Sequence, residues 1–517
     1  MPHRPNNRAR ASALRIAEWS ARSATELKEI GIDLESLRGL ETRLRGKVIL
    51  RGAPGYDAAR REANPAFQHY PQFVAYCEVI EDVRLCLAFA HSQNLWVACR
   101  AGGHSFGGYS VNSGMVIDVS RMSCVHVLPD ERIARVGAGT SFGHLNAVLD
   151  EYGLHVPGGA CEDVCVAGYM QGGGYGYTSR RFGMNCDNVV EFRMMLRDGR
   201  VVTASEERNA DLFWAVRGGT GGNFGVLLEI TYRLSRLGPV WSFGWVWDIE
   251  HAPSLLTELQ RGFMRTGASR NLGYMASLAD HKNRKVFALQ GIYLGTAAEG
   301  HAALAPLKAI AAPIKEAENT GSYYRMNEWA DDKPYPMPDV PDTGVKEAKQ
   351  AGYIARPLSR DDWKGIVEFY KTSPSPYNTV VIEPYGGAIN EYPEFGNAFV
   401  HRNVDMDFFV DVFWIHDDKK AEAVAWLDHF MQLMGRYFNG HVYQNYPRDT
   451  LTNYRSMYFG AAFDALLYIK NKYDPPPCFF RYQQSIKPYA DDEKPDVVCD
   501  PEILARFTNG DIVYDRT

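Results

Sequence analysis

Two glycine-rich stretches of the chain each hold one side chain that can bond to a ligand. RAGGHSFGGYS, from Arg100, contains His104, and VPGGACEDVCVAGYMQGGGYG, from Val156, contains Cys161. Glycine has no Cβ atom, so backbone N–H groups in such loops can approach a ligand closely. Consecutive N–H groups can also form a nest for phosphate oxygens. We therefore interpret the first loop as a cradle for a pyrophosphate group.

Neither loop matches the common nucleotide or zinc motifs. A P-loop carries a Lys-Ser or Lys-Thr pair after its last glycine, and no such pair follows Gly108. The run GGGYGYTS, from Gly172, lacks the third glycine of the spacing G-x-G-x-x-G. Zinc is disfavoured because the chain has no CxxC or HExxH spacing. Taken singly, His104 would more often be a hydrogen-bonding turn residue, and Cys161 a buried small hydrophobe.

Five motifs in order resemble the flavin oxidoreductases of the vanillyl-alcohol oxidase type, in the branch of berberine bridge enzyme and sugar oxidases. They are RAGGHS from Arg100, VIDVSRM from Val116, the Cys161 loop, DNV from Asp187 and GGTGGNFGV from Gly218. The resemblance covers Arg51 to Ile486. It implies an α+β fold class, with a PCMH-type FAD-binding domain, and an FAD cofactor.

The resemblance also implies two covalent bonds to FAD. His104 aligns with the residue linked to the flavin 8α-methyl group, and Cys161 aligns with the residue linked to flavin C6. Cys165 stands where the family usually has glycine, so we do not expect it to be linked. Further residues are expected to line the FAD site: Arg100, Ala101, Gly102, Gly103, Ser105, Gly168, Gly172, Gly173, Gly174, Gly176, Gly221, Gly222, Asn223 and Val226.

The composition is that of a globular protein. The 517 residues are 45% hydrophobic and 23% charged, enough for two or three domains. A net charge of −6 argues against a nucleic-acid surface, and no apolar run reaches the roughly 18 residues of a membrane helix. The nine cysteines, an odd number, favour a reducing compartment. We therefore predict a cytoplasmic protein with no nucleic-acid or membrane partner.

The order of patterns along the chain predicts its domains. Residues 1–50 should form a helical extension; their first part could pass for a transit peptide, but an amphipathic helix is favoured. Residues 51–238 should form the FAD-binding domain, with a hairpin at Asp198-Gly199. Residues 239–445 should form a substrate domain, an antiparallel sheet with helices on one face. Residues 446–517 should return to the FAD-binding domain. The Pro-rich stretch 331–344 could line the substrate entrance, although a plain surface loop is the default.

The resemblance implies that a hydride passes from a substrate carbon to flavin N5 while a base takes the hydroxyl proton. YQNYPRD resembles the family segment whose tyrosines reach the flavin. In a regular strand Tyr443 and Tyr446 would point to opposite faces, and we favour Tyr446 as the base. Its pKa, about 10 when unperturbed, would have to fall, through a nearby cation, a second tyrosine or the oxidised flavin.

Four further residues receive roles by resemblance. Glu383 or Tyr385, in VIEPYGG, could contact substrate, and structural roles beside a turn at Gly386 and Gly387 are the alternative. Tyr169 should lie near the flavin. Val164 aligns with a position near flavin C4a, where valine resembles the oxygen-reactive members.

We therefore predict an oxidase that oxidises a sugar or natural-product alcohol and reduces O₂ to hydrogen peroxide. A dehydrogenase with another acceptor, an oxidative cyclisation, or a fold without turnover remain the alternatives. Berberine-type ring closure uses a Glu base, and none stands in the YQNY segment.

Overall fold

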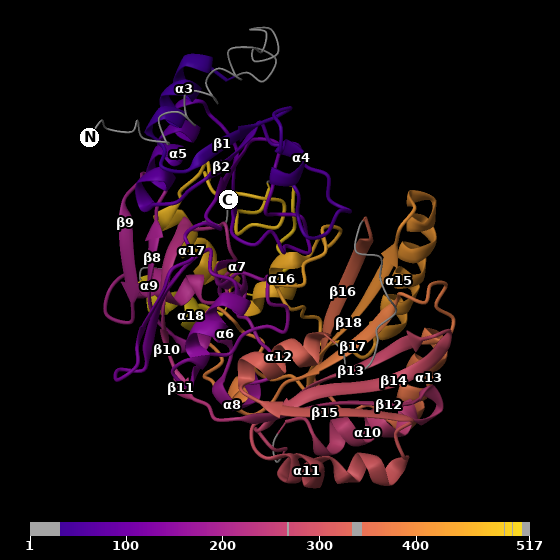
Figure 1. Cartoon of the computed structure of the whole chain (residues 1–517). Helices are drawn as coiled ribbons and strands as arrows, with labels where there is room; N and C mark the ends of the chain where they lie inside the picture. Colours follow the sequence, from indigo (N-terminus) through magenta and orange to yellow (C-terminus); the bar gives the residue numbers. More distant parts are fainter. Residues whose placement is uncertain (1–31, 266–267, 333–343, 491, 499, 509–517) are drawn as a thin grey trace, which may run out of the picture.

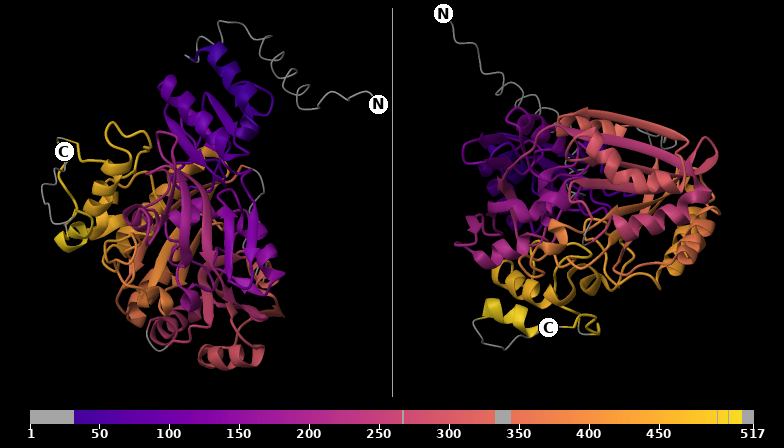
Figure 2. Two further views of the ribbon diagram at one scale, coloured as in Figure 1. Left: turned by 90° about the vertical axis from the view of Figure 1, so that its left-hand side faces the viewer. Right: turned by 90° about the horizontal axis from the view of Figure 1, so that it is seen from below.

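The computed structural model describes residues 32–265, 268–332, 344–490, 492–498 and 500–508 (Figures 1 and 2). Most of the predicted loop at 331–344 and the start of the predicted N-terminal extension lie outside these residues. No helix in the described ranges is long and apolar enough to cross a membrane. The predicted α+β class is confirmed, because helices and three main sheets are both present.

The first sheet has four strands in the order β1-β2-β4-β3. Its strands are β1 (Lys47–Leu50), β2 (Phe73–Tyr76), β3 (Val97–Arg100) and β4 (Met115–Asp118). Helix α5 (Ile80–Ser92) connects β2 to β3, and helix α3 (Leu34–Arg43) contacts α5. The helical prediction for residues 1–50 is therefore wrong at its end, because residues 47–50 pair with β2. Val48 and Leu50 are buried, which is the alternation of a strand.

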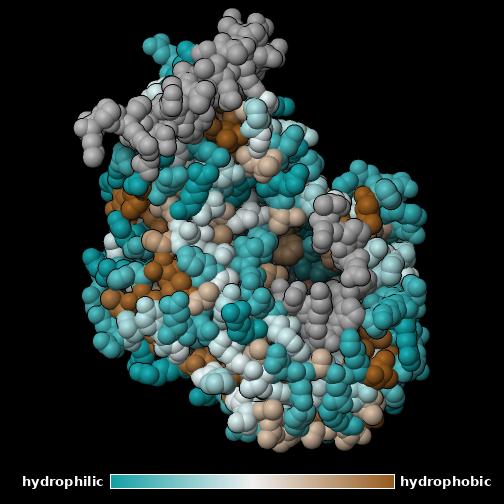
Figure 3. Space-filling view, in the orientation of Figure 1, coloured by the Kyte–Doolittle hydropathy of each residue, from teal (hydrophilic) through white to brown (hydrophobic). Residues whose placement is uncertain are grey.

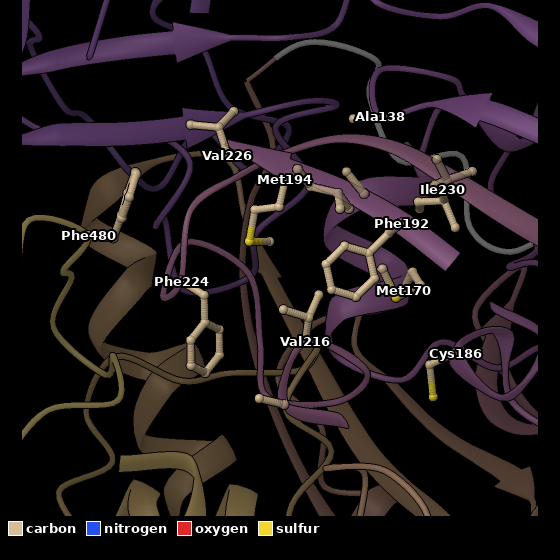
Figure 4. Close-up of a cluster of buried hydrophobic side chains, with 14 of the residues drawn as sticks. Ala138, Met170, Cys186, Phe192, Met194, Val216, Phe224, Val226, Ile230 and Phe480 are labelled. Carbon is tan, nitrogen blue, oxygen red and sulfur yellow. The ribbon is translucent and has the colours of Figure 1, made fainter. Parts of the chain in front are cut away.

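The second sheet has five antiparallel strands in the order β5-β6-β10-β8-β9. They are β5 (Val125–Leu128), β6 (Ile133–Gly137), β8 (Val189–Met195), β9 (Val201–Ser205) and β10 (Val226–Arg233). The predicted hairpin between β8 and β9 is confirmed, and Gly199 takes a φ of 80° in its turn. Figure 4 shows Phe480 of the C-terminal segment near Phe224 and Val226 in the core beside this sheet.

The third sheet has seven antiparallel strands in the order β15-β12-β14-β13-β17-β18-β16. They are β12 (Val240–Asp248), β13 (Leu272–His281), β14 (Arg284–Tyr293), β15 (Lys315–Gly321), β16 (Lys346–Ile354), β17 (Thr379–Pro384) and β18 (Met406–Trp414). Helices α10 (Ala252–Gly262), α11 (Ala297–Ile310), α13 (Arg360–Tyr370) and α15 (Lys420–Met434) pack on one face (Figure 1). This arrangement confirms the predicted antiparallel sheet with a helix-covered face, and α12 (Tyr323–Asp332) packs against β12, β14 and β15 from the other side.

Successive side chains along each strand of this sheet point to its two opposite faces. On β17 and β18, Val380, Ile382, Phe408 and Val410 pack into the helix-covered core. The intervening odd-numbered residues therefore point to the opposite face. That opposite face is turned toward the rest of the molecule, and it forms part of the site described below.

Shorter elements complete the chain. The helices are α4 (Tyr56–Ala59), α6 (Phe142–Asp150), α7 (Val166–Gln171), α8 (Ser179–Phe182), α9 (Ala210–Val216), α12 (Tyr323–Asp332), α14 (Ala388–Glu391), α16 (Tyr454–Phe459), α17 (Phe463–Tyr473) and α18 (Pro501–Thr508). The strands β7 (Leu154–His155) and β11 (Ser235–Arg236) pair with each other. The 3₁₀ helices are η1 (Asn185–Asn188), η2 (Ile249–His251), η3 (Asp417–Lys419) and η4 (Gly460–Ala462). Helix α17 contacts α9, so the chain returns to its first half after the third sheet.

Candidate active site

A cavity of about 700 Å³ lies between the glycine-rich loops and the open face of the seven-stranded sheet. The surface is hollowed beside β16 in Figure 3, which has the orientation of Figure 1. Both predicted loops line the cavity, and a third loop at 220–222, the turn at 443–447 and the segment 480–484 line it as well. The cavity therefore collects most of the segments that the sequence singled out.

The loop after β3 brings its backbone to the cavity. Arg100 anchors the end of the strand, because its Nε donates to Oδ2 of Asp118 at 2.5 Å and both side chains are buried. Gly103 then takes a φ of 76°, which favours glycine. A Cβ atom on Gly102 would lie 3.1 Å from the backbone nitrogen of Cys165. The two glycines thus allow the His104 loop to pass close to the Cys161 loop.

His104 and Cys161 both line the cavity. Nε2 of His104 lies 3.0 Å from Oδ2 of Asp163, and this hydrogen bond holds the pKa of the carboxyl below its ordinary value. The Cys161 side chain is exposed, whereas Cys165 is buried and its Sγ donates to the carbonyl oxygen of Gly139. Burial raises the pKa of Cys165 to about 12, so its thiol is a poor nucleophile at neutral pH.

The other predicted FAD-site residues divide into two groups. Ten of them line the cavity: Arg100, Ala101, Gly102, Gly103, Ser105, Gly168, Gly176, Gly221, Gly222 and Val226. Gly172, Gly173, Gly174 and Asn223 do not line it. Asn223 holds the loop together instead, since its Nδ2 donates to Thr220 and its Oδ1 accepts from the Ile486 N–H. A Cβ on Gly174 would lie 2.3 Å from the Tyr169 ring, so that glycine makes room for packing.

The opposite wall comes from odd-numbered residues on three neighbouring strands. Glu383 of β17 pairs in register with Asp407 of β18, and Thr379 pairs with Asp411. Lys349 of β16 stands opposite Asp411 on the other side of β18. All of these except Asp407 line the cavity. The sheet register therefore assembles a charged patch from residues far apart in the sequence.

Lys349 is the cation of this patch. Its Nζ lies 2.8 Å from Oδ1 of Asp411. The same Nζ lies 3.8 Å from the ring centroid of Phe409, 4.7 Å from that of Tyr446 and 4.6 Å from that of Phe106. A cation over an aromatic ring is attracted by the ring quadrupole. Lys349 is therefore a cation next to the ring of Tyr446, and no sequence motif pointed to it.

The two candidate tyrosines lie in a turn and not in a strand. The N–H of Tyr446 donates to the carbonyl oxygen of Tyr443 at 2.8 Å, and the two ring centroids are 5.0 Å apart. Both tyrosines line the cavity, so the prediction that a regular strand would direct them to opposite faces does not apply. Pro447 follows directly and donates no N–H, which is compatible with a turn.

The two hydroxyl groups differ in their partners. Tyr446 donates to Oε2 of Glu383 at 3.3 Å. The Tyr443 oxygen accepts hydrogen bonds from the Gly174 N–H at 3.0 Å and from Asn445 at 2.9 Å. Burial raises the pKa of both tyrosines and of Glu383 above their ordinary values. Neither tyrosine is therefore readily ionised in this cavity. A role as base for either one requires a neighbouring group that accepts its proton.

The remaining predicted residues take different positions. Tyr169 lines the cavity, but its hydroxyl donates to the carbonyl oxygen of Tyr175. Val164 is half-buried and lines the cavity. Tyr385 does not line it, because its side chain is fully buried behind the wall, with its hydroxyl 2.9 Å from that of Tyr353. The expected contact between Tyr385 and substrate therefore finds no support in its position.

Sequence reasoning missed Asp163, Lys349, Asp407, Asp411 and Phe106. One signal for Asp407 and Asp411 was present: the otherwise apolar strand MDFFVDVFW carries these two charged residues. Buried charges are rare unless they are paired or functional. Their spacing of four also places them on one face of that strand.

Two family models match separate parts of the chain. The FAD binding domain matches residues 71–205, and the family described as berberine and berberine like matches residues 442–487. YvdP of Bacillus subtilis, an FAD-linked oxidoreductase, is 30% identical over 455 residues, which are 86% of this chain and 99% of that protein.

Solved structures resemble the whole arrangement. Physcomitrella patens BBE-like 1 superposes with a TM-score of 0.79 at 25% identity, over 87% of this chain and 98% of that one. Xylooligosaccharide oxidase from Myceliophthora thermophila, in complex with xylobiose, gives a TM-score of 0.78 at 21% identity, over 88% and 99% of the two chains. The latter likeness shows the fold alone.

The residues of the cavity suit an FAD molecule. Three glycine-bearing loops give the cavity a wall of accessible backbone. A nucleophilic imidazole and an exposed thiol stand on the same cavity. The volume is also within the range of roughly 300–1,000 Å³ found for ligand sites.

Proposed function

Because the chain belongs to the family of berberine bridge enzyme-like FAD-linked oxidoreductases, we propose that it oxidises a CH–OH group of a sugar or natural-product alcohol. FAD is bonded to His104 and Cys161, and O₂ is the acceptor that yields hydrogen peroxide. One observation carries the proposal: a Tyr446–Glu383 pair lines the same cavity as His104 and Cys161. One cavity would thus hold both the cofactor and the base.

The bound flavin supplies a hydride acceptor, and the protein supplies the proton acceptor. The substrate hydroxyl gives its proton to the oxygen of Tyr446, while the proton of Tyr446 passes along the existing hydrogen bond to Glu383. A carboxyl whose pKa is raised holds that proton better than an ordinary one. Tyr446 then never has to exist as a free phenolate, which removes the difficulty of its raised pKa.

Lys349 assists the same step. Its ammonium group lies over the ring of Tyr446 and attracts negative charge that develops there during proton transfer. Asp411 holds the ammonium in place at 2.8 Å. This ion pair therefore holds the lysine next to the ring.

The wall chemistry supports a polyhydroxylated substrate. Phe106 and Phe409 offer aromatic surface, and Asp411 offers carboxylate oxygens, which accept hydrogen bonds from hydroxyl groups. The Thr379 hydroxyl lines the cavity, is buried, and has no hydrogen-bond partner among the described residues. A buried hydroxyl without a partner is unfavourable, and a ligand hydroxyl would satisfy it.

An oxidative cyclisation is the second candidate. The absence of Glu from the YQNY segment counted against it in the sequence analysis, but the fold brings Glu383 into hydrogen-bond contact with Tyr446. The lack of Glu in that segment therefore does not exclude a Glu base. A dehydrogenase that uses another acceptor remains the alternative if O₂ reacts slowly.

A substrate screen tests the proposal. The purified protein should be yellow and should release peroxide with an oligosaccharide or a secondary alcohol. An active alcohol should reduce the flavin without oxygen, and the Tyr446→Phe variant should reduce it far more slowly with the same alcohol. If no alcohol reduces the flavin while a phenolic amine does, the second candidate takes its place.

We also propose a cytoplasmic location, because the odd number of cysteines favours a reducing compartment.

A further inference from the structure

The carboxylate of Asp163 lies beside the imidazole ring of His104. Oδ2 of Asp163 is 3.0 Å from Nε2 of His104, and Asp163 belongs to the same loop as Cys161. His104 lines the cavity, whereas Asp163 lines a second, more open hollow together with Gly102 and Cys165. Asp163 therefore approaches the ring from the side away from the cavity.

This contact selects one tautomer of His104. The pKa of Asp163 is held below its ordinary value by the His104 hydrogen bond, so the carboxylate is ionised and can only accept. Nε2 must then carry the hydrogen, which leaves a lone pair on Nδ1 of the neutral ring. In the part of the chain that the structure describes, no protein group forms a hydrogen bond to Nδ1. The nitrogen that can act as a nucleophile is thus left for the cavity.

We propose that Asp163 is a positioning residue for covalent attachment of the flavin, because it fixes the His104 tautomer whose Nδ1 bonds to the 8α-carbon. This inference rests on the proposed bond between His104 and FAD. The Asp163 carboxylate also orients the ring, as carboxylates do for histidines that bind metals.

Attachment would exchange two bonds for one and reduce the flavin by two electrons. One C–H bond of the 8α-methyl group and the N–H bond of the neutral imidazole break, and one N–C bond forms. The methyl hydrogen and two electrons would remain on the flavin and leave it reduced, while the Nε2 proton would leave to solvent by way of the Asp163 carboxylate. Dioxygen then takes these two electrons and two protons, and hydrogen peroxide forms. Asp163 is unchanged at the end of the step.

Asp163 can be replaced with little risk to the fold. Its side chain is 77% exposed, and exposed ion pairs contribute little to stability. The neighbouring Glu162 gives a matched control, because its side chain lies against Gly143 of α6. Removal of a carboxylate from either position changes the loop charge equally.

The test measures attachment through His104 alone, in a Cys161→Ser background. Apoprotein from cells starved of riboflavin is mixed with FAD, and the flavin that stays with acid-precipitated protein is followed in time. We expect Asp163→Ala to slow attachment about 10- to 100-fold, the range seen when the carboxylate partner of a metal-binding histidine is removed. Asp163→Glu should restore most of the rate, and Asp163→Asn should lie between. Glu162→Gln should match the parent.

The outcomes separate this inference from the proposed function. Attachment at the parent rate in Asp163→Ala overturns the role of Asp163 and leaves the covalent bond intact. A parent protein that never retains flavin overturns the bond itself and the inference with it. Non-covalent FAD binding and the unfolding temperature are measured for each variant. If the attachment rate falls only in proportion to FAD affinity or to unfolding temperature, the substitution has damaged the site. That result also overturns the positioning role.

Discussion

The hydroxyl of Tyr446 donates a hydrogen bond to Oε2 of Glu383 across 3.3 Å. The tyrosine lies in the turn after β18 and α15, and the glutamate lies on β17. Burial raises the pKa of both groups, so each is a stronger proton acceptor than in water once ionised. The pair therefore forms a two-step route for a proton, and its members can be tested one at a time.

Tyr446→Phe removes the hydroxyl and keeps the ring that packs against Phe409. We expect the rate of flavin reduction by substrate to fall about 10²- to 10⁴-fold, the usual contribution of a general base. Rapid-mixing absorbance measurements without oxygen report this rate. Tyr443→Phe is the matched control, because its hydroxyl contacts Gly174 and Asn445 instead of Glu383. A crippled Tyr443→Phe beside a normal Tyr446→Phe would move the role to Tyr443.

Glu383→Gln should change the dependence of the reaction on pH. The carboxyl must be ionised to accept a proton, so in the wild type the reduction rate rises with pH as Glu383 ionises, above its ordinary range. The glutamine variant cannot accept this proton, and it should react about 10²-fold more slowly and lack that rise. Reduction rates between pH 5 and 9 measure both effects. A variant that keeps the same rise excludes Glu383 as its origin.

Sequence motifs selected more of the residues on the His104 wall of the cavity than on the opposite wall. His104, Gly102 and Gly103 follow directly on strand β3, so one local pattern carries both the loop and its chemistry. The charged wall depends on the register of β16, β17 and β18, and that register brings Lys349 and Glu383 near Asp411 and Asp407. No local spacing encodes such a register.

Two expectations depended on local geometry that the sequence does not show. Alternation was applied to Tyr443 and Tyr446 as if their segment were a strand, but the hydrogen bond between their backbones closes a turn. The resemblance of VIEPYGG to a family strand selects Tyr385 together with Glu383. Tyr385 is separated from Glu383 by Pro384 at the end of β17, and its side chain packs into the core.

Asp407→Asn should stabilise the protein more as the pH rises. Burial raises the pKa of Asp407 to about 8, from an ordinary value of 3.8. Between these two pH values the Asp407 carboxyl is ionised in the unfolded chain and still protonated in the folded protein, so each increase in pH favours unfolding. The Asp407→Asn variant has no carboxyl at this position, so it does not lose stability in this way. The gain in unfolding temperature over the wild type should grow from pH 5 to pH 8.

Asp418→Asn is the control for that experiment, since Asp418 is exposed. Its effect on the unfolding temperature should stay near zero at every pH. An Asp407→Asn gain that is constant with pH would show that Asp407 is already ionised in the folded protein.

The cofactor bonds can be counted by removing one nucleophile at a time. Denatured wild-type protein should keep its flavin on the polypeptide. His104→Ala and Cys161→Ala should each keep one bond, and the double variant should release all flavin. Cys165→Ala is the matched control, because the raised pKa of Cys165 and its hydrogen bond to Gly139 argue against a bond to flavin. Acid precipitation and peptide mass measurements read out each case. Complete release of flavin from the wild type would exclude both bonds.

Val164→Leu tests the reaction with oxygen. Val164 lines the cavity in the same loop as Cys161, and its carbonyl oxygen accepts from the Phe142 N–H at 2.9 Å. The backbone is therefore fixed, and the added methylene group must extend into the cavity or against the half-buried side of the loop. We expect reoxidation of the reduced flavin by O₂ to slow at least several-fold, while reduction by substrate stays within about twofold. Rapid mixing of each half-reaction measures the two rates separately.

Val166→Leu is the matched control, since Val166 is fully buried and does not line the cavity. Equal reoxidation rates in wild type and Val164→Leu would remove Val164 from the oxygen reaction, and a slow rate in both would favour the dehydrogenase.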